Sequence, residues 1–284
     1  MFAITGITGQ VGGAVARTLL AAGKDVRAVV RDPGKAESWE RAGCEVALAA
    51  MQDANALEQA FAGAEAAFVL MPPNFDPSPE FKESRAIAHA IGTALEAAKP
   101  GRVVCISTIG AQARQENLLN QLGILERELA GLAIPVTLLR PAWFMENAAW
   151  DVAAARDTGL ISSFLQPLDR RIPMVATADV GRVAAELLQE SGTGTRVVEL
   201  EGPRPVSPDD IAAGLARFLG RSVRAQAVPR ESWEALFRSQ GMRNPLPRIQ
   251  MLDGFNAGWL RFEHATRKGC VELEVVLRSL VERA

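Results

Sequence analysis

Tyrosine is absent from this sequence of 284 residues, and histidine occurs only twice, as His89 and His264. Lysine is scarce: the five lysines are Lys24, Lys35, Lys82, Lys99 and Lys268. Without tyrosine, a catalytic Tyr-Lys pair is impossible, and a Ser-His-Asp triad would have to use one of two isolated histidines. The composition therefore argues against two common designs of active site before any motif is considered.

Cysteine is also rare, and Cys44, Cys105 and Cys270 lie far apart in the sequence. An odd number of dispersed cysteines in apolar surroundings is typical of small buried side chains in a reducing compartment. No group of cysteine and histidine residues has the spacing of metal ligands. We expect three buried thiols and no metal site.

Long hydrophobic runs and an excess of one charge are missing as well. No apolar segment approaches the ~20 residues that a membrane-spanning helix needs. The first 16 residues carry no charge, but they lack the basic start of a signal peptide and contain four glycines. The 31 basic and 33 acidic residues nearly balance, which favours neither nucleic acid nor an anionic membrane as partner. We expect a cytoplasmic protein.

Short apolar runs alternate with helical patterns through the first half of the chain. The predicted strands are 2–4, 25–30, 44–48, 66–70, 102–107 and 135–139. The predicted helices between them are 10–22, 36–41, 54–62, 80–98 and 117–130. Strands without alternating polarity, separated by helices, predict a doubly wound parallel sheet that is covered on both faces, an α/β fold.

The alternation loosens after residue 150. The pattern there predicts strands over 195–200 and 223–228, and helices over 177–190, 208–219, 230–240, 247–262 and 271–282. We expect residues 1–150 to form the sheet domain, with residues 175–192 returning to it. Residues 151–284 are expected to form mainly a smaller α+β lobe that closes over the carboxyl ends of the strands.

A glycine-rich loop joins the first predicted strand to the first helix. Gly6 suits a tight turn, Gly9 lets backbone N–H groups approach a pyrophosphate, and Gly12 lets helix and strand pack closely. The helix N-terminus would then face the anion. The loop residues expected to bind a dinucleotide are Gly6, Thr8, Gly9, Gln10, Val11 and Gly12. The alternative is a glycine-rich turn without a ligand.

The end of the second strand bears on the choice of cofactor. An acidic residue there would hold the ribose hydroxyls of NAD, whereas an arginine would pair with the 2′-phosphate of NADP. Arg31 comes directly off the strand, Asp32 precedes Pro33 in a turn-like pattern, and Lys35 adds a second positive charge. This order favours NADP and leaves NAD open.

Further cofactor contacts are expected where other strands end. Asp53 either caps the following helix or lies near the adenine, and both roles stay open. The remaining candidates are Met71 and Pro72 after the fourth strand, Ser107 at the end of the fifth and Pro141 after the sixth. Simple strand termination is the alternative at each position.

Several segments together resemble the NmrA-like branch of the atypical short-chain dehydrogenase/reductases. The segments are residues 5–12 (TGITGQVG), 30–33 (VRDP), 139–147 (LRPAWFMEN), 178–181 (ADVG) and 200–203 (LEGP), followed by Ser207 and a helix. The resemblance extends to about residue 240 and implies a Rossmann fold that binds NADP(H), with a C-terminal lobe forming a substrate cleft. Dehydrogenases of this superfamily use a Tyr-x-x-x-Lys pair on the helix after the fifth strand, but residues 117–126 (NLLNQLGILE) contain neither residue.

The missing pair restricts the chemistry. Reduction of a ketone needs a proton donor for the developing alkoxide, and a hydroxyl such as Ser107 or Thr108 is a poor acid. A quinone accepts a hydride readily, so hydrogen bonds and a dry apolar pocket suffice. The residues expected to line such a pocket are Phe75, Trp143, Phe144 and Asn147. Alternatively, Trp143 and Phe144 are packing between the lobes.

Two functions follow from the resemblance and the missing pair. The first is an oxidoreductase that passes a hydride from NADPH to a quinone-like small-molecule acceptor. The second is a non-enzymatic NADP(H) redox sensor that acts through a protein partner. An isoflavone-type reductase is disfavoured because Leu122 or a neighbour stands where its catalytic lysine would fall. The oligomeric state is left open.

Overall fold

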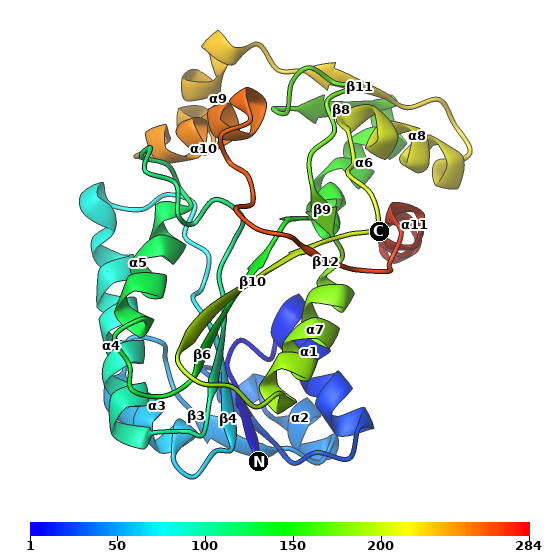
Figure 1. Ribbon diagram of the computed structural model, residues 1–284. Helices are drawn as coiled ribbons and strands as arrows, with labels where there is room; N and C mark the ends of the chain where they lie inside the picture. The colour runs from blue at the N-terminus through cyan, green and yellow to red at the C-terminus, as the bar shows by residue number, and fades with distance from the viewer.

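A parallel sheet of eight strands forms the centre of the computed structural model, which describes all 284 residues (Figure 1). The strand order is β12-β10-β6-β5-β4-β1-β2-β3. The strands are β1 (Phe2–Ile4), β2 (Val26–Val30), β3 (Glu45–Leu48), β4 (Ala66–Leu70), β5 (Val103–Ile106), β6 (Val136–Pro141), β10 (Thr195–Glu201) and β12 (Arg267–Lys268). The chain reverses its direction of winding between β1 and β4, and this switch point is where doubly wound sheets bind ligands.

Helices cover both faces of this sheet, as the sequence pattern predicts (Figure 1). One face carries α1 (Gln10–Ala21), α2 (Glu37–Arg41) and α7 (Thr177–Gln189), and the other carries α3 (Ala54–Phe61), α4 (Lys82–Ala98) and α5 (Asn120–Leu129). Strands β1, β5 and β6 are buried along their whole length. Continuous burial explains why their sequences lack polar alternation.

Helices α1 and α7 cross at close range beside the glycine loop. A side chain on Gly181 of α7 would collide with Ala14 of α1, so the crossing requires glycine. This contact fixes the position of α1, whose N-terminus lies at the switch point of the sheet. Residues 177–189 thus pack on the sheet formed mainly by the first half of the chain.

A second hydrophobic core lies above the carboxyl ends of the strands (Figure 1). The helices around it are α6 (Ala149–Thr158), α8 (Pro208–Leu219), α9 (Trp233–Ser239), α10 (Leu246–Ala257) and α11 (Leu273–Arg283). Two parallel strand pairs complete this region: β8 (Leu160–Ser163) with β11 (Arg224–Ala227), and β7 (Trp143–Phe144) with β9 (Met174–Val175). Strands β10 and β12 leave it to join the central sheet, a pairing that the sequence pattern did not reveal.

Several element boundaries differ from those predicted. The helix predicted over 247–262 ends at Ala257, because Gly258 adopts a left-handed conformation with φ +79°. Helix α4 begins at Lys82 rather than at residue 80, since Glu80 and Phe81 have positive φ. Because α10 ends early, residues 258–266 form a segment that connects it to β12, the edge strand of the sheet.

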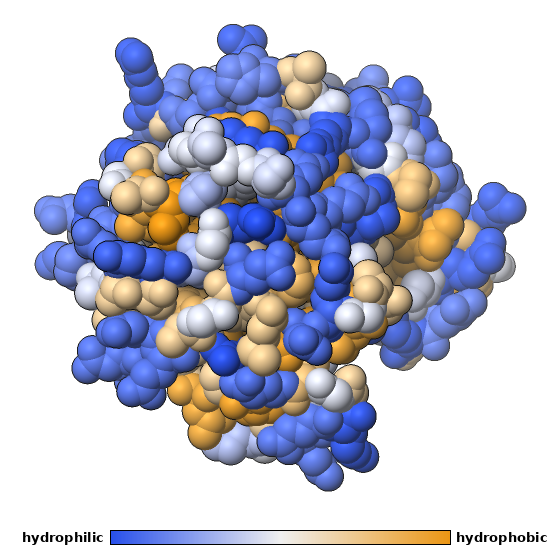
Figure 2. Space-filling model, turned by 60° about the horizontal axis from the view of Figure 1, so that its bottom comes forward, coloured by the Kyte–Doolittle hydropathy of each residue, from blue (hydrophilic) through white to orange (hydrophobic).

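The outer surface offers no large apolar face in the view of Figure 2, where hydrophobic residues form small patches between hydrophilic ones. None of the helices combines the length and the hydrophobicity required to cross a lipid bilayer.

Candidate functional site

The three glycines of the loop after β1 have different structural roles. Gly6 has φ +61°, and a side chain there would also lie 2.5 Å from Leu70. A side chain on Gly12 would collide with the carbonyl oxygen of Gly6. At Gly9 a Cβ atom would meet only that same oxygen, at 3.3 Å. Gly6 and Gly12 therefore shape the loop, whereas Gly9 leaves its outer side open.

The N-terminus of α1 has no internal cap. Gly9 occupies the N-cap position without a side-chain hydrogen bond, and the first turn contains no acidic residue. Thr8, Gly9 and Gln10 are exposed. The free N–H groups and the positive end of the helix dipole fit a phosphate group.

Two basic side chains stand free at the end of β2. Arg31 and Lys35 are exposed and form no ion pair within the protein. The carboxylate of Asp32 accepts a hydrogen bond from the N–H of Gly34 at 3.0 Å and so caps a short turn. The carboxylate of Asp32 is thus engaged in the turn, whereas the guanidinium of Arg31 has no partner within the protein.

The other residues predicted to contact the cofactor differ in how much of each is accessible to a ligand. Asp53 caps α3 by accepting a hydrogen bond from the N–H of Ala56 at 3.0 Å. Met71 is 4 % exposed and packs in the core under α3 and α4, so only its backbone can meet a ligand. Pro72 is exposed, and Pro141 is buried at the end of β6.

The loop after β4 is held from two sides. Gln121 of α5 donates a hydrogen bond to the carbonyl of Asn74 at 2.9 Å and accepts one from Ser84 at 2.7 Å. Asp76 accepts hydrogen bonds from the N–H groups of Asn244 at 2.7 Å and Arg243 at 3.1 Å. These two N–H groups lower the pKa of Asp76. The loop therefore joins the sheet to the C-terminal lobe.

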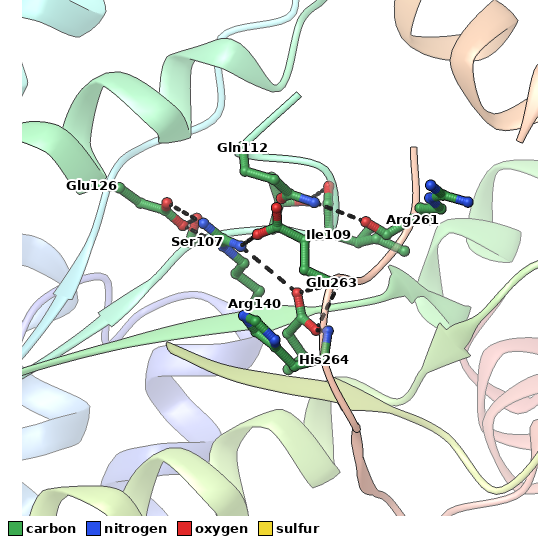
Figure 3. Close-up of polar contacts among 10 residues, drawn as sticks. Ser107, Ile109, Gln112, Glu126, Arg140, Arg261, Glu263 and His264 are labelled. Carbon is green, nitrogen blue, oxygen red and sulfur yellow. Dashed lines mark hydrogen bonds and ion pairs between the residues drawn. The ribbon is translucent and has the colours of Figure 1, made fainter. Parts of the chain in front are cut away.

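Helix α5 contains neither tyrosine nor lysine, and it presents Glu126 to Ser107 at the end of β5 (Figure 3). Ser107 donates its hydroxyl proton to Glu126 at 2.5 Å. Thr108 donates to the carbonyl of Ile109 at 3.2 Å. In this geometry both hydroxyl protons are engaged within the protein, so neither is free for a substrate oxygen.

Arg140 of β6 neutralises Glu126 and two further carboxylates. It donates to both oxygens of Glu126, at 2.8 and 2.7 Å, and to Glu263 at 2.9 Å (Figure 3). A carboxylate oxygen of Glu199 lies 3.7 Å from the guanidinium. Glu199 in turn accepts hydrogen bonds from the N–H groups of Glu263 and His264. Burial by itself would lower the pKa of Arg140, but the hydrogen bonds and charge of Glu126 raise it. The network joins four segments far apart in the chain, which is why the sequence pattern missed it.

The cysteines are only partly as predicted. Cys44 and Cys105 are buried, and burial raises the pKa of both thiols, with Glu126 adding to the effect at Cys105. Cys270 is exposed, contrary to the expectation of three buried thiols. It follows the β12 segment, where its N–H donates to Asp179 at 2.9 Å.

The predicted pocket aromatics do not share one surface. Trp143 packs into the C-terminal core, edge-to-face on Phe255 with ring centres 5.2 Å apart, whereas Phe144 packs against the core under α1 and α7. Neighbouring residues of a strand point to opposite faces, so Trp143 and Phe144 pack against different cores instead of lining one pocket together. Phe75 remains 44 % exposed. Asn147 is half-buried, and its amide has no hydrogen-bond partner in the protein.

A cavity of about 580 Å³ borders the Arg140 network. The residues that line it are Gln112, Ala113, Arg114, Trp259, Arg261, Phe262 and Glu263. Neither arginine forms an ion pair, and Glu263 is shared with the network. None of the residues predicted to hold an acceptor lines this cavity.

Comparison with known proteins agrees with this geometry. The model of the NmrA-like family matches residues 1–256. The chain is 27 % identical to NAD(P)H azoreductase of Xenophilus azovorans, over 87 % of this chain and 83 % of that protein. It is 28 % identical to quinone oxidoreductase 2 of Escherichia coli, over 87 % and 84 %.

Solved structures extend the similarity to nearly the whole chain. The NADPH-dependent quinone oxidoreductase of Escherichia coli in complex with NADPH superposes with a TM-score of 0.77 and 26 % identity, covering 99 % of this chain and 95 % of that one. Triphenylmethane reductase of Citrobacter shares the fold with a TM-score of 0.78 at 21 % identity, over 99 % of both chains. With a family model that matches nine-tenths of its length, the chain belongs to the NmrA-like family.

Proposed function

We propose that this chain is an NADPH-dependent oxidoreductase that passes a hydride directly to a quinone-like acceptor. Two observations carry the proposal: the N-terminus of α1 is open and glycine-lined, and the buried polar residues of α5, on the other face of the sheet, offer no free proton donor. Gln121 and Glu126, the buried polar residues of α5, are both engaged within the protein. The named activities of the azoreductase and quinone reductase relatives support an enzyme over a redox sensor.

The residues present fit a dinucleotide. The free backbone N–H groups of residues 10–12 would hold the pyrophosphate, and Arg31 with Lys35 would hold the 2′-phosphate. Pro72 and the backbone of Met71 would lie along the nicotinamide half, with Pro141 and Ser107 at the neighbouring strand ends. Ser107 would act there only as a hydrogen-bond acceptor, because its proton is directed at Glu126.

The chemistry that bound NADPH would supply is transfer of one hydride: the quinone gains two electrons and one proton, and the product anion takes its second proton from solvent water after the transfer. The product oxygen is weakly basic, so no protein acid has to protonate it in the transition state. The amide of Asn147 is free to hydrogen-bond an acceptor oxygen, and Phe75 offers an exposed ring. The protein thus contributes orientation and exclusion of water.

The acceptor range tests this mechanism. With NADPH, we expect turnover of quinones or azo dyes and none of simple unactivated ketones, and no high-pH limb of the kind that a catalytic tyrosine produces. Asn147→Ala should lower kcat/KM for a quinone and leave the Kd for NADPH nearly unchanged. Robust ketone reduction would contradict the mechanism. Tight NADPH binding without turnover of any acceptor would favour the sensor instead.

Cofactor preference provides a second test. In the parent protein NADPH should bind more tightly than NADH, and Arg31→Glu should reduce that preference at least about tenfold, because a charge-assisted contact to phosphate is lost. Lys35→Gln should have a smaller effect in the same direction. Calorimetric titration with both cofactors measures this, and equal affinities in the parent protein would rule out the role of Arg31.

A further inference from the structure

Arg248 of α10 is a half-buried arginine without an anionic partner. No carboxylate lies within ion-pair distance, and its only side-chain contact of hydrogen-bond type is the sulfur of Met242 at 3.9 Å. Burial lowers the pKa of Arg248, and no neighbouring charge offsets this effect. Arg140, by contrast, is surrounded by three carboxylates. Buried charges in proteins are normally paired. Arg248 is an exception, because no acidic side chain of the protein pairs with it.

Two phenylalanine rings lie beside the Arg248 guanidinium. Its central carbon lies 4.5 Å from the centre of the Phe237 ring and 5.8 Å from that of Phe75. Phe75 also meets Trp150 edge-to-face, with ring centres 6.4 Å apart. Phe75 is 44 % exposed and Trp150 66 % exposed. Two exposed rings and an unpaired cation therefore meet where the loop after β4, α6 and α10 come together.

The acidic residues nearby do not neutralise Arg248. Asp76 is engaged by the N–H groups of Arg243 and Asn244, and Asp253, also on α10, pairs with Arg230 at 2.7 Å. Asp151 follows Trp150 on α6 and forms no ion pair; burial raises its pKa to about 6. No carboxylate of this chain therefore pairs with Arg248.

We propose that Phe75, Trp150 and Arg248 form the acceptor subsite and select a planar aromatic acceptor that carries a carboxylate or sulfonate group. The inference rests on the proposed function, since it describes the acceptor side of the same reaction. Exposed rings provide edges and faces against which a flat acceptor packs. The guanidinium donates a pair of parallel hydrogen bonds to an oxyanion, and partial burial strengthens them. The loop that carries Phe75 is anchored to both lobes, which keeps the subsite in place.

Paired acceptors test the subsite: 1,2-naphthoquinone-4-sulfonate and uncharged 1,2-naphthoquinone, each with saturating NADPH. The measured quantity is the ratio of kcat/KM for the sulfonate to kcat/KM for the neutral quinone. Arg248→Met should lower this ratio about tenfold, the lower end of what a charge-assisted hydrogen bond contributes. Arg248→Lys should retain part of it, because the positive charge remains.

Arg261→Met is the matched control, because Arg261 is an exposed, unpaired arginine in the cavity that borders the Arg140 network. It should leave the ratio unchanged. Trp150→Ala removes an exposed ring and is expected to raise KM for both quinones without unfolding the protein; thermal melts check each variant.

Three results would overturn the inference. An unchanged ratio in Arg248→Met shows that Arg248 does not bind the sulfonate. A ratio that falls in Arg261→Met instead places the acceptor in the cavity lined by Arg114 and Arg261. Unchanged KM values in Trp150→Ala exclude its ring from the subsite. Failure of the proposed function looks different: NADPH binds to the parent protein but neither quinone is reduced, and the subsite proposal falls with it.

Discussion

Replacement of Arg140 by methionine should lower the free energy of unfolding by about 3–5 kcal/mol, the loss typical of breaking a buried ion pair from one side. Its side chain is only 6 % exposed, and it is the cation that Glu126, Glu199 and Glu263 share. Removing it leaves the carboxylates of Glu126 and Glu199 buried with no compensating charge. Urea denaturation at neutral pH measures the loss.

Two companion variants separate charge from packing at this position. Arg140→Lys keeps the charge but cannot donate to both oxygens of Glu126, so an intermediate loss is expected. The double variant Arg140→Met/Glu126→Gln removes one uncompensated carboxylate and should be more stable than Arg140→Met alone. A loss below about 1 kcal/mol in Arg140→Met would show that the network does not hold the strand ends together.

The second large effect is expected for Gly9→Val, which should weaken NADPH binding about a hundredfold or more while the protein stays folded. The backbone at Gly9, with φ −92° and ψ 177°, suits any residue. An added Cβ would touch only the carbonyl oxygen of Gly6, at 3.3 Å. The valine side chain would instead occupy the space through which a phosphate reaches the N–H groups. Losing two charge-assisted hydrogen bonds accounts for that magnitude.

Gly12→Val is the informative contrast. A Cβ atom at this position would collide with the carbonyl oxygen of Gly6 and lie 2.9 Å from the N atom of Ile7. Both the stability of the protein and its affinity for NADPH should therefore fall. Calorimetric titration and thermal unfolding, applied to both variants, distinguish a blocked ligand from a distorted loop. Normal NADPH binding by Gly9→Val would show that the loop does not hold the pyrophosphate.

Local patterns in the sequence were sufficient for the parts of the fold that depend on near neighbours. The buried apolar runs of β1, β4, β5 and β6 predicted a parallel sheet, and the structure contains it. The order Arg31-Asp32-Pro33 predicted a turn at Asp32, which its hydrogen bond to Gly34 forms. Each of these features needs only contacts within a few residues, or burial that every residue of a strand shares.

The predicted acceptor pocket was harder to derive, for a physical reason. Trp143 and Phe144 are adjacent in sequence, but the two-residue strand β7 sends them into different cores. Trp150 and Arg248 carry no motif, and they meet Phe75 only because α6 and α10 fold over the loop after β4. Side-chain direction and contacts between distant segments decide such a pocket, and neither can be read from spacing.

The sequence by itself determined the absence of Tyr-Lys chemistry, the doubly wound sheet and the glycine loop at the start of the first helix, because composition and short-range spacing are sufficient for each. Only the tertiary structure decided where the protons and charges lie. The hydroxyl of Ser107 donates a hydrogen bond to Glu126, and Arg140 pairs with carboxylates that lie up to 123 residues away in the sequence. A buried charge needs a partner wherever the fold can supply one; at Arg140 the fold supplies three, and at Arg248 it supplies none.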